Sequence, residues 1–185
     1  MKIQKFFSVA ILGLVLVFGA NSFAQKTVTV GGAPMYPAKN IIENAVNSKD
    51  HTTLVAAVKA GDLVETLSSK GPFTVFAPTN EAFSKLPAGT VETLVKPENK
   101  AMLQGILTYH VLAGKFNSKA IAAAIKAGNG IAEFKTVQGG KIICKMDGKK
   151  LVITDEKGNK STVTIADVNQ SNGVIHVVDT VIMHN

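Results

Sequence analysis

The sequence predicts an α+β protein with a single domain. Three observations support this class. Apolar residues recur at helical spacing through most of residues 40–127, strand-like alternation takes over from Ile131 onward, and no internal repeat or second domain is visible. Helices that precede a meander of strands are typical of α+β folds, whereas α/β folds alternate the two.

The first 24 residues have the features of an export signal. Lys2 and Lys5 precede an apolar run over residues 9–19, and Ser22-Phe23-Ala24 offers the small residues of a cleavage site. The run is shorter than the ~20 residues of a membrane-spanning helix, so no permanent membrane span is expected, with a signal anchor as the alternative. We therefore expect an exported protein, periplasmic, extracellular or on the cell surface.

Residues 25–38 contain two glycines and two prolines, and we expect them to form a flexible N-terminal lead. A single domain then covers residues 39–185. Its first helix is predicted to begin after Asn40, whose side chain can cap free backbone donors. A second helix begins at Thr52 or Thr53 and ends at Gly61, and a short third follows.

The middle of the chain combines one strand with three further helices. An apolar strand from Phe73 leads to Thr79, which is expected to cap the next helix. Pro97 suits the first turn of another helix, because its missing N–H is not needed there. Asn117 or Ser118 begins a last helix that stops at Gly128.

Alternating strands are predicted in the C-terminal part. They cover residues 142–146, 151–154, 162–166 and 174–182, and Asp147-Gly148 forms a tight hairpin turn between the first two. Cys144 is the only cysteine, so no internal disulfide can form. Its spacing from Ile142 and Met146 indicates a buried strand position, with a reactive thiol as the alternative.

All basic residues of the chain other than histidine are lysines. Cleavage of the signal would leave 18 lysines against 13 acidic residues and no arginine. Arginine is the side chain that grips phosphates and guanine edges in two places, so a dedicated nucleic-acid partner is not expected. Lys149 and Lys150 belong to a lysine-rich segment beside the predicted hairpin turn. This segment is either a solvated hairpin protected against edge pairing or a face for a polyanion.

Two longer motifs and a shorter one stand out. FTVFAPTNEAF over residues 73–83 contains Phe76, Pro78, Thr79, Asn80 and Phe83. SNGVIHVVDTVIM over residues 171–183 contains Asn172, Gly173 and His176, and TYHVL lies at residues 108–112. In this order the motifs resemble the fasciclin (FAS1) domain family over nearly the whole mature chain.

The resemblance implies a compact antiparallel β wedge or sandwich with a helical layer, and a part in cell adhesion or matrix contact. It makes Tyr109-His110 a binding candidate, because animal relatives use this pair in integrin adhesion. The alternative is a buried histidine that ties two segments together. Asn80 replaces an aspartate of the family, and either residue could bond to neighbouring backbone.

A second adhesion stretch of animal relatives corresponds to Asp167-Val168 here, but the Glu-Pro before it and the methionine after it are missing. These two residues therefore stand as binding candidates with a loop-capping role for Asp167 as the alternative. Most residues of the long motifs, His176 included, are expected to build the scaffold.

No catalytic, metal or phosphate-loop motif is present, and the four histidines lack a ligand spacing. We expect no enzyme, cofactor or metal. Two functions remain open. One is an exported module that binds a cell-surface or matrix protein or polysaccharide. The other is a carrier of a small apolar ligand, such as a carotenoid or another lipid, in a cleft of the wedge.

Overall fold

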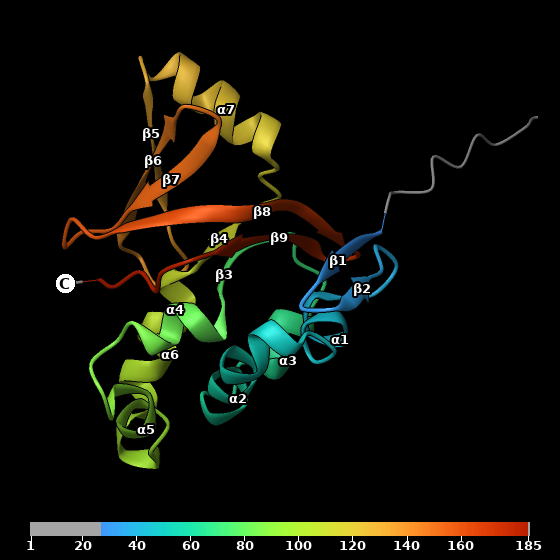
Figure 1. Ribbon diagram of the computed structural model, residues 1–185, viewed down its shortest axis with the longest axis vertical. Helices are drawn as coiled ribbons and strands as arrows, with labels where there is room; N and C mark the ends of the chain where they lie inside the picture. Colours follow the sequence, from blue (N-terminus) through green and yellow to red (C-terminus); the bar gives the residue numbers. More distant parts are fainter. Residues whose placement is uncertain (1–26, 185) are drawn as a thin grey trace, which may run out of the picture.

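The computed structural model describes residues 27–184, and its main sheet has seven strands that lie between Phe73 and Val178 (Figure 1). The expected export signal and its cleavage site lie outside the described residues. The sheet has the order β4-β3-β9-β8-β7-β6-β5, and a separate hairpin consists of β1 and β2.

The helices come mostly from the first two thirds of the chain. They are α1 (Ile41–Ala45), α2 (Thr52–Ala60), α3 (Val64–Ser68), α4 (Asn80–Ser84), α5 (Thr90–Leu94), α6 (Lys100–Tyr109) and α7 (Ser118–Ala127), with 3-10 turns η1 (Lys49–His51) and η2 (Pro97–Asn99). The strands are β1 (Val28–Val30), β2 (Ala33–Met35), β3 (Phe73–Pro78), β4 (Val111–Ala113), β5 (Ile131–Lys135), β6 (Lys141–Asp147), β7 (Lys150–Thr154), β8 (Lys160–Gln170) and β9 (Gly173–Val178). The α+β class predicted from the sequence is confirmed.

The two long motifs meet inside the sheet, where β3 and β9 lie between β4 and β8. β3 pairs with β9 in parallel, and the other strand pairs are antiparallel. Alternation along β9 sends Ile175 and Val177 toward the helices and Val178 toward the interior of the wedge. Both faces of these central strands are therefore covered, which explains why their sequence is almost wholly apolar.

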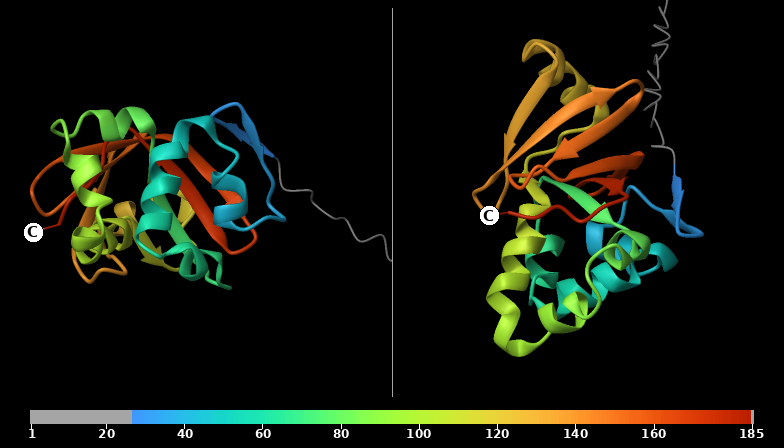
Figure 2. Two further views of the ribbon diagram at one scale, coloured as in Figure 1. Left: turned by 90° about the horizontal axis from the view of Figure 1, so that it is seen from below. Right: turned by 60° about the vertical axis from the view of Figure 1, so that its left-hand side comes forward.

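Two apolar clusters lie on opposite faces of the central strands. The first packs helices α1 to α6 against β3 and β9, with Leu54, Leu103 and Ile175 among its residues. The second fills the wedge between the two ends of the bent sheet, where α7 contributes Ile121 and Ile125. Figure 2 shows the helical layer on one side of the sheet and α7 over the other end.

The segment expected to be a flexible lead instead contains the β1–β2 hairpin. Val30, Ala33 and Met35 are buried against the helical layer, and Gly31 and Gly32 supply the positive φ values of the turn. The hairpin is ordered because every second residue is apolar and finds a buried position. The buried side chains thus begin well before residue 39, where the domain was expected to start.

The last predicted strand is shorter than expected. β9 ends at Val178, although Val181 and Ile182 beyond it are buried. These residues pack as an extended tail without a partner strand, so their apolar character reflects burial and not sheet pairing. No helix within residues 27–184 has the length and apolar character needed to cross a bilayer.

Candidate functional site

His110 lies in the interior of the molecule, with 3% of its surface exposed. Its Nδ1 lies 2.8 Å from the carbonyl oxygen of Ile106, and its Nε2 accepts from the backbone N–H of Ile182 at 3.1 Å. Since Nε2 accepts, the proton of the neutral ring is on Nδ1 and is donated to Ile106. His110 thus ties the end of α6 to the C-terminal tail.

Burial lowers the pKa of His110 to about 4, with the Ile106 carbonyl and the charge of Asp155 opposing that shift. Tyr109 is also fully buried, and its hydroxyl donates to the Lys141 carbonyl at 2.6 Å. Burial is the main cause that raises the pKa of Tyr109 to about 12. The arrangement favours the structural interpretation of the Tyr-His pair.

Asp167 and Val168 also serve the fold. Asp167 interrupts β8 at an irregularity in the ladder, with a positive φ of 59°. Its carboxylate accepts from the backbone N–H of Ser118 at 2.6 Å and from the hydroxyl of the same residue. The expected capping role for Asp167 therefore applies to the start of α7, and Val168 is buried in the helix-side cluster.

The remaining motif residues hold distant segments together. Asn172 accepts from Ile41 N–H and donates to the carbonyls of Leu67 and Ser69. Gly173 follows it because a Cβ there would lie 2.1 Å from the Phe73 carbonyl oxygen. The turn between β8 and β9 is thus locked to both α1 and α3.

His176 lies fully buried beside its strand partner Phe76, with ring centroids 5.7 Å apart. Nδ1 accepts from Asp167 N–H at 3.3 Å, and Nε2 lies 2.8 Å from the Phe116 carbonyl oxygen, to which it donates. Burial lowers the pKa of His176. The ring bridges the backbone of Asp167 and Phe116 in the interior of the molecule.

Asn80 does more than fix its own turn. Thr79 caps α4 by accepting from Ala82 N–H. Asn80 instead reaches back along the chain, where Oδ1 accepts from Thr53 N–H at 2.9 Å and Nδ2 donates to the Lys49 carbonyl at 2.8 Å. It caps α2 from another element, and Pro78 and Phe83 are buried beside this junction.

Lys149 and Lys150 are the binding candidates that face solvent. They lie on one side of a cleft of about 680 Å³, opposite Ser118 and Lys119 at the start of α7. We name this site the lysine cleft. Its lining residues are Ser118, Lys119, Ala122, Met146, Lys149, Lys150, Leu151, Thr162, Val163, Thr164, Ala166 and Asp179. In Figure 1 it corresponds to the region between α7, β7 and β8.

The lysine cleft belongs to the positively charged half of the molecule. Residues 115–160 contain ten lysines and four acidic residues, whereas residues 27–114 contain seven of each. The hairpin of Lys149 and Lys150 joins β6 and β7, and its tip extends past the last pairs with β5 (Ile131↔Lys145) and β8 (Val152↔Thr162). The two lysines therefore lie where the hairpin has no neighbouring strand, and both protection against edge pairing and binding of a polyanion agree with this position.

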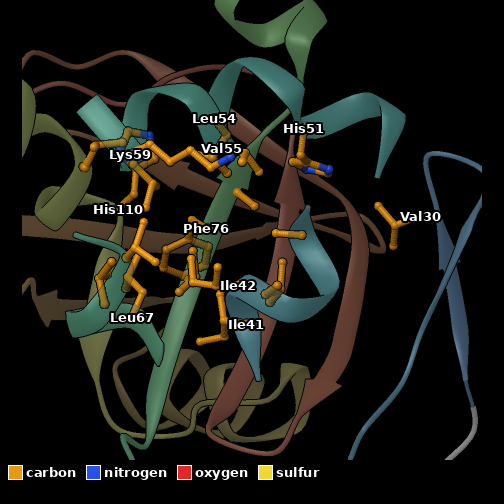
Figure 3. Close-up of a pocket in the computed structure, with 18 of the residues that line it drawn as sticks. Val30, Ile41, Ile42, His51, Leu54, Val55, Lys59, Leu67, Phe76 and His110 are labelled. Carbon is orange, nitrogen blue, oxygen red and sulfur yellow. The ribbon is translucent and has the colours of Figure 1, made fainter. Parts of the chain in front are cut away.

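A second hollow lies under α1 and α2, next to β3 (Figure 3). It is a narrow apolar cavity of about 50 Å³, with His51, Leu54 and Val75 among its lining residues. His51 is 3% exposed, and Nδ1 bonds to the Ser48 hydroxyl at 2.9 Å, while Nε2 makes no hydrogen bond. Burial lowers the pKa of His51, and the nearby Ala77 carbonyl opposes this shift.

Cys144 is fully buried in the wedge cluster, and burial raises the pKa of its thiol to about 12. The position agrees with the interpretation as a small core residue. Among residues 27–184, histidine, cysteine, aspartate and glutamate side chains form no group of three or more that could hold a metal ion.

The fold is a bent sheet with a helical layer. Its long sequence motifs build the scaffold, and its lysines gather at one end of the molecule. A family model described as the fasciclin domain matches residues 49–184. The chain belongs to the fasciclin domain family.

Relatives with similar sequences come from bacteria and animals. Protein sll1483 of Synechocystis is 51% identical over 160 residues, which cover 86% of this chain and 81% of the relative. Immunogenic protein MPT70 of Mycobacterium tuberculosis is 37% identical, with 75% and 66% covered. Human periostin is 33% identical, and the match covers 76% of this chain but 15% of periostin.

Among solved structures, the FAS1 domain pair of the insect cell adhesion molecule fasciclin I is similar, with a TM-score of 0.69 and 18% sequence identity. The match covers 78% of this chain and 51% of that pair. At this identity the likeness shows the fold, and it confirms the FAS1 wedge expected from the motifs.

Sequence reasoning missed one side of the lysine cleft and the whole apolar cavity. Lys119 reaches the cleft from α7, and no local sequence pattern connects it with the 147–150 turn or with Thr162 of β8. The only sequence signal was the excess of lysine after residue 115. His51 gave no signal, because a lone histidine ahead of a helix is ordinary.

Proposed function

We propose that this protein is an exported, non-catalytic FAS1 module that binds a protein or polysaccharide of the cell surface or matrix. The observation that carries the proposal is the division between scaffold and surface. Tyr109, His110, Asp167 and the long motifs are used in internal hydrogen bonds, while the lysine cleft stays open to solvent.

Family membership supports the proposal, and two relatives support its location. One is named a cell surface glycolipoprotein, MPB83 of Mycobacterium bovis, and is 29% identical over 171 residues. The similar insect structure belongs to a cell adhesion molecule. Export of this chain follows from the interpretation of its first 24 residues as a signal.

The purified protein tests this function on an array of glycans, envelope fractions and matrix proteins. We expect saturable capture by at least one class of surface component, with the heat-unfolded protein as control. Capture that is equal for folded and unfolded protein, or absent throughout, would contradict the proposal. Location is checked separately, by fractionating cells that express the full chain with and without residues 1–24.

A second candidate function is that of a carrier for a small apolar ligand, and the cavity of Figure 3 favours it. The walls are almost entirely aliphatic and the unbonded His51 Nε2 could pair with one polar atom of a ligand. The volume of about 50 Å³ is well below the roughly 300–1,000 Å³ of ligand pockets. A lipid-sized ligand therefore requires α1 and α2 to move apart.

Native mass spectrometry of protein purified from its own host tests the carrier function. A bound molecule that is released when Leu54→Trp fills the cavity would support it. Repeatedly ligand-free protein, from extracts in which the candidate lipids are abundant, would count against it. Leu54 is 9% exposed and lines the cavity, so its enlargement acts where the ligand would lie.

A further inference from the structure

The lysine cleft carries positive charge that the protein does not neutralise. Lys119, Lys149 and Lys150 are exposed and make no ion pair with any residue of the described part of the chain. Asp147 lies opposite Lys150 in the β6–β7 ladder, but their side chains form no ion pair. Three ammonium groups around one hollow attract an anion, because their mutual repulsion falls when it binds.

The carboxylate of Asp179, which lines the cleft, already accepts hydrogen bonds from within the protein. Asp179 accepts from Thr162 N–H at 2.8 Å and from the Thr180 hydroxyl at 3.0 Å through Oδ1. Its backbone carbonyl accepts from Lys85 at 2.6 Å. Asp179 thus fixes the wall of the cleft and reduces the positive potential only in part.

The floor and the neutral groups of the cleft suit a sugar. Met146, Leu151 and Val163 provide aliphatic surface against which the C–H face of a sugar ring can pack. The Thr162 hydroxyl lines the cleft and makes no hydrogen bond within residues 27–184, so it is available to a ligand hydroxyl. The volume of about 680 Å³ lies in the roughly 300–1,000 Å³ range of ligand sites.

The distribution of charge favours a polymer over a single small anion. The cleft has no arginine to grip one phosphate in two places. Lysine excess instead extends beyond the cleft through residues 115–160, which contain ten lysines, three of them in the cleft, and four acidic residues. A chain with repeated negative groups can contact several of these lysines at once, which raises its overall affinity.

We propose that the lysine cleft binds an acidic polysaccharide, one sugar unit in the cleft and neighbouring carboxylate or sulfate groups on the lysines around it. This proposal rests on the proposed function and names the partner of that surface. Affinity comes from many weak charge contacts, so binding is moderate and weakens as salt screens it.

The test compares three proteins on immobilised polygalacturonate and dextran sulfate, with neutral dextran as the blank, at low and raised salt. The first is the wild type and the second is the cleft variant. The third is a control variant with the same loss of charge from exposed lysines of residues 27–114, away from the cleft and the lysine-rich surface around it. The cleft variant carries Lys119→Gln, Lys149→Gln and Lys150→Gln, and the control carries Lys49→Gln, Lys70→Gln and Lys96→Gln.

We expect the cleft variant to bind about tenfold more weakly than the wild type, since each exposed ion pair contributes about two- to fivefold. The control should lose no more than about twofold, through the weaker general field. A second cleft variant with arginine at the three positions should keep its binding, which shows that charge and not folding is responsible. Equal losses in cleft and control variants, or no loss in either, would overturn the assignment to the cleft.

Two further results distinguish an acidic polysaccharide from other possible partners of the same surface. Binding to phosphatidylglycerol vesicles without binding to either polysaccharide would overturn it in favour of a membrane surface. Capture of the wild type by a neutral glycan or a protein alone would overturn it and leave the proposed function standing. If no polysaccharide, glycan, protein or vesicle captured the wild type, both this proposal and the proposed function would be contradicted.

Discussion

At the scale of single residues, the buried polar side chains of this protein are connectors. His110 joins α6 to the C-terminal tail, His176 joins β9 to the segment before α7, and Asn172 joins a turn to two helices. Each satisfies backbone groups that no helix or strand partner serves. A buried polar group costs little when bonded and much when left alone, so these residues specify the fold more than they stabilise it.

Stability should therefore depend on pH through His110. Its pKa is lowered from 6.5 to about 4 in the folded protein, so the unfolded chain binds more protons between these values. The free energy of unfolding is highest above pH 6.5 and falls as the pH drops toward 4, by about 2 to 4 kcal/mol from this residue. Urea unfolding across this window measures the slope.

The His110→Gln variant separates this residue from the others. The variant should be less stable at neutral pH, yet its stability should fall less steeply between pH 6.5 and 4. A remaining slope is expected from His51 and His176, since burial lowers the pKa of both. Equal slopes for variant and wild type would show that His110 does not titrate in this way.

Asn80 offers a second test, because its side chain bonds to two backbone groups of another segment. The structure shows that the Asn80 amide donates to the Lys49 carbonyl, which a carboxylate cannot do. Asn80→Asp should lower the free energy of unfolding by about 1 to 2 kcal/mol, as a donor is replaced by a repelling acceptor. Asn129→Asp in an exposed turn is the control, and an equal effect of both changes would contradict the role given to Asn80.

At the scale of elements, the sequence predicted the parts with a strong local signal. The helices that start at Asn40 and Asn117 were predicted from their caps, and both caps are present. β6 and β7 were predicted from alternation and a tight turn. In each case the decisive interactions lie within a few residues, so sequence alone contains them.

Elements that depend on distant contacts were missed or misjudged. The Gly31-Gly32 pair suggested flexibility, yet it forms the turn of β1–β2 because Val30 and Met35 find buried positions beside helices. The lysine cleft likewise arises where α7 and the 147–150 turn approach each other. Neither the contact of the hairpin with the helices nor the contact of α7 with the turn can be predicted from the spacing of residues along the chain.

The hairpin should contribute measurably to stability. Met35 is 3% exposed, so Met35→Ala removes packed atoms and should cost about 2 to 4 kcal/mol in the free energy of unfolding. Pro34→Ala, at the neighbouring exposed position, should change it by less than about 0.5 kcal/mol. Denaturant unfolding measures both variants. If both had the same free energy of unfolding as the wild type, the segment would be a flexible lead and not a packed hairpin.

At the scale of the whole molecule, no internal disulfide contributes to stability, since Cys144 is the only cysteine. This thiol is fully buried between α7 and the sheet, and its pKa is raised to about 12. We expect a thiol reagent to label native protein at the rate of unfolding and denatured protein at once. Rapid labelling of the native state would contradict the closed wedge, and reductant should leave the unfolding temperature unchanged.

The parallel neighbour of β3 comes from a segment 100 residues later in the chain, since Phe73 lies opposite Gly173. β3 begins at Phe73, but its parallel neighbour ends at Val178, so the two are far apart in sequence. A ribosome must therefore synthesise and release the chain through Val178 before β3 can pair fully with β9, and the long loop between the two strands must close at that moment. Until then the nascent chain lacks the strand pair that separates the two apolar clusters.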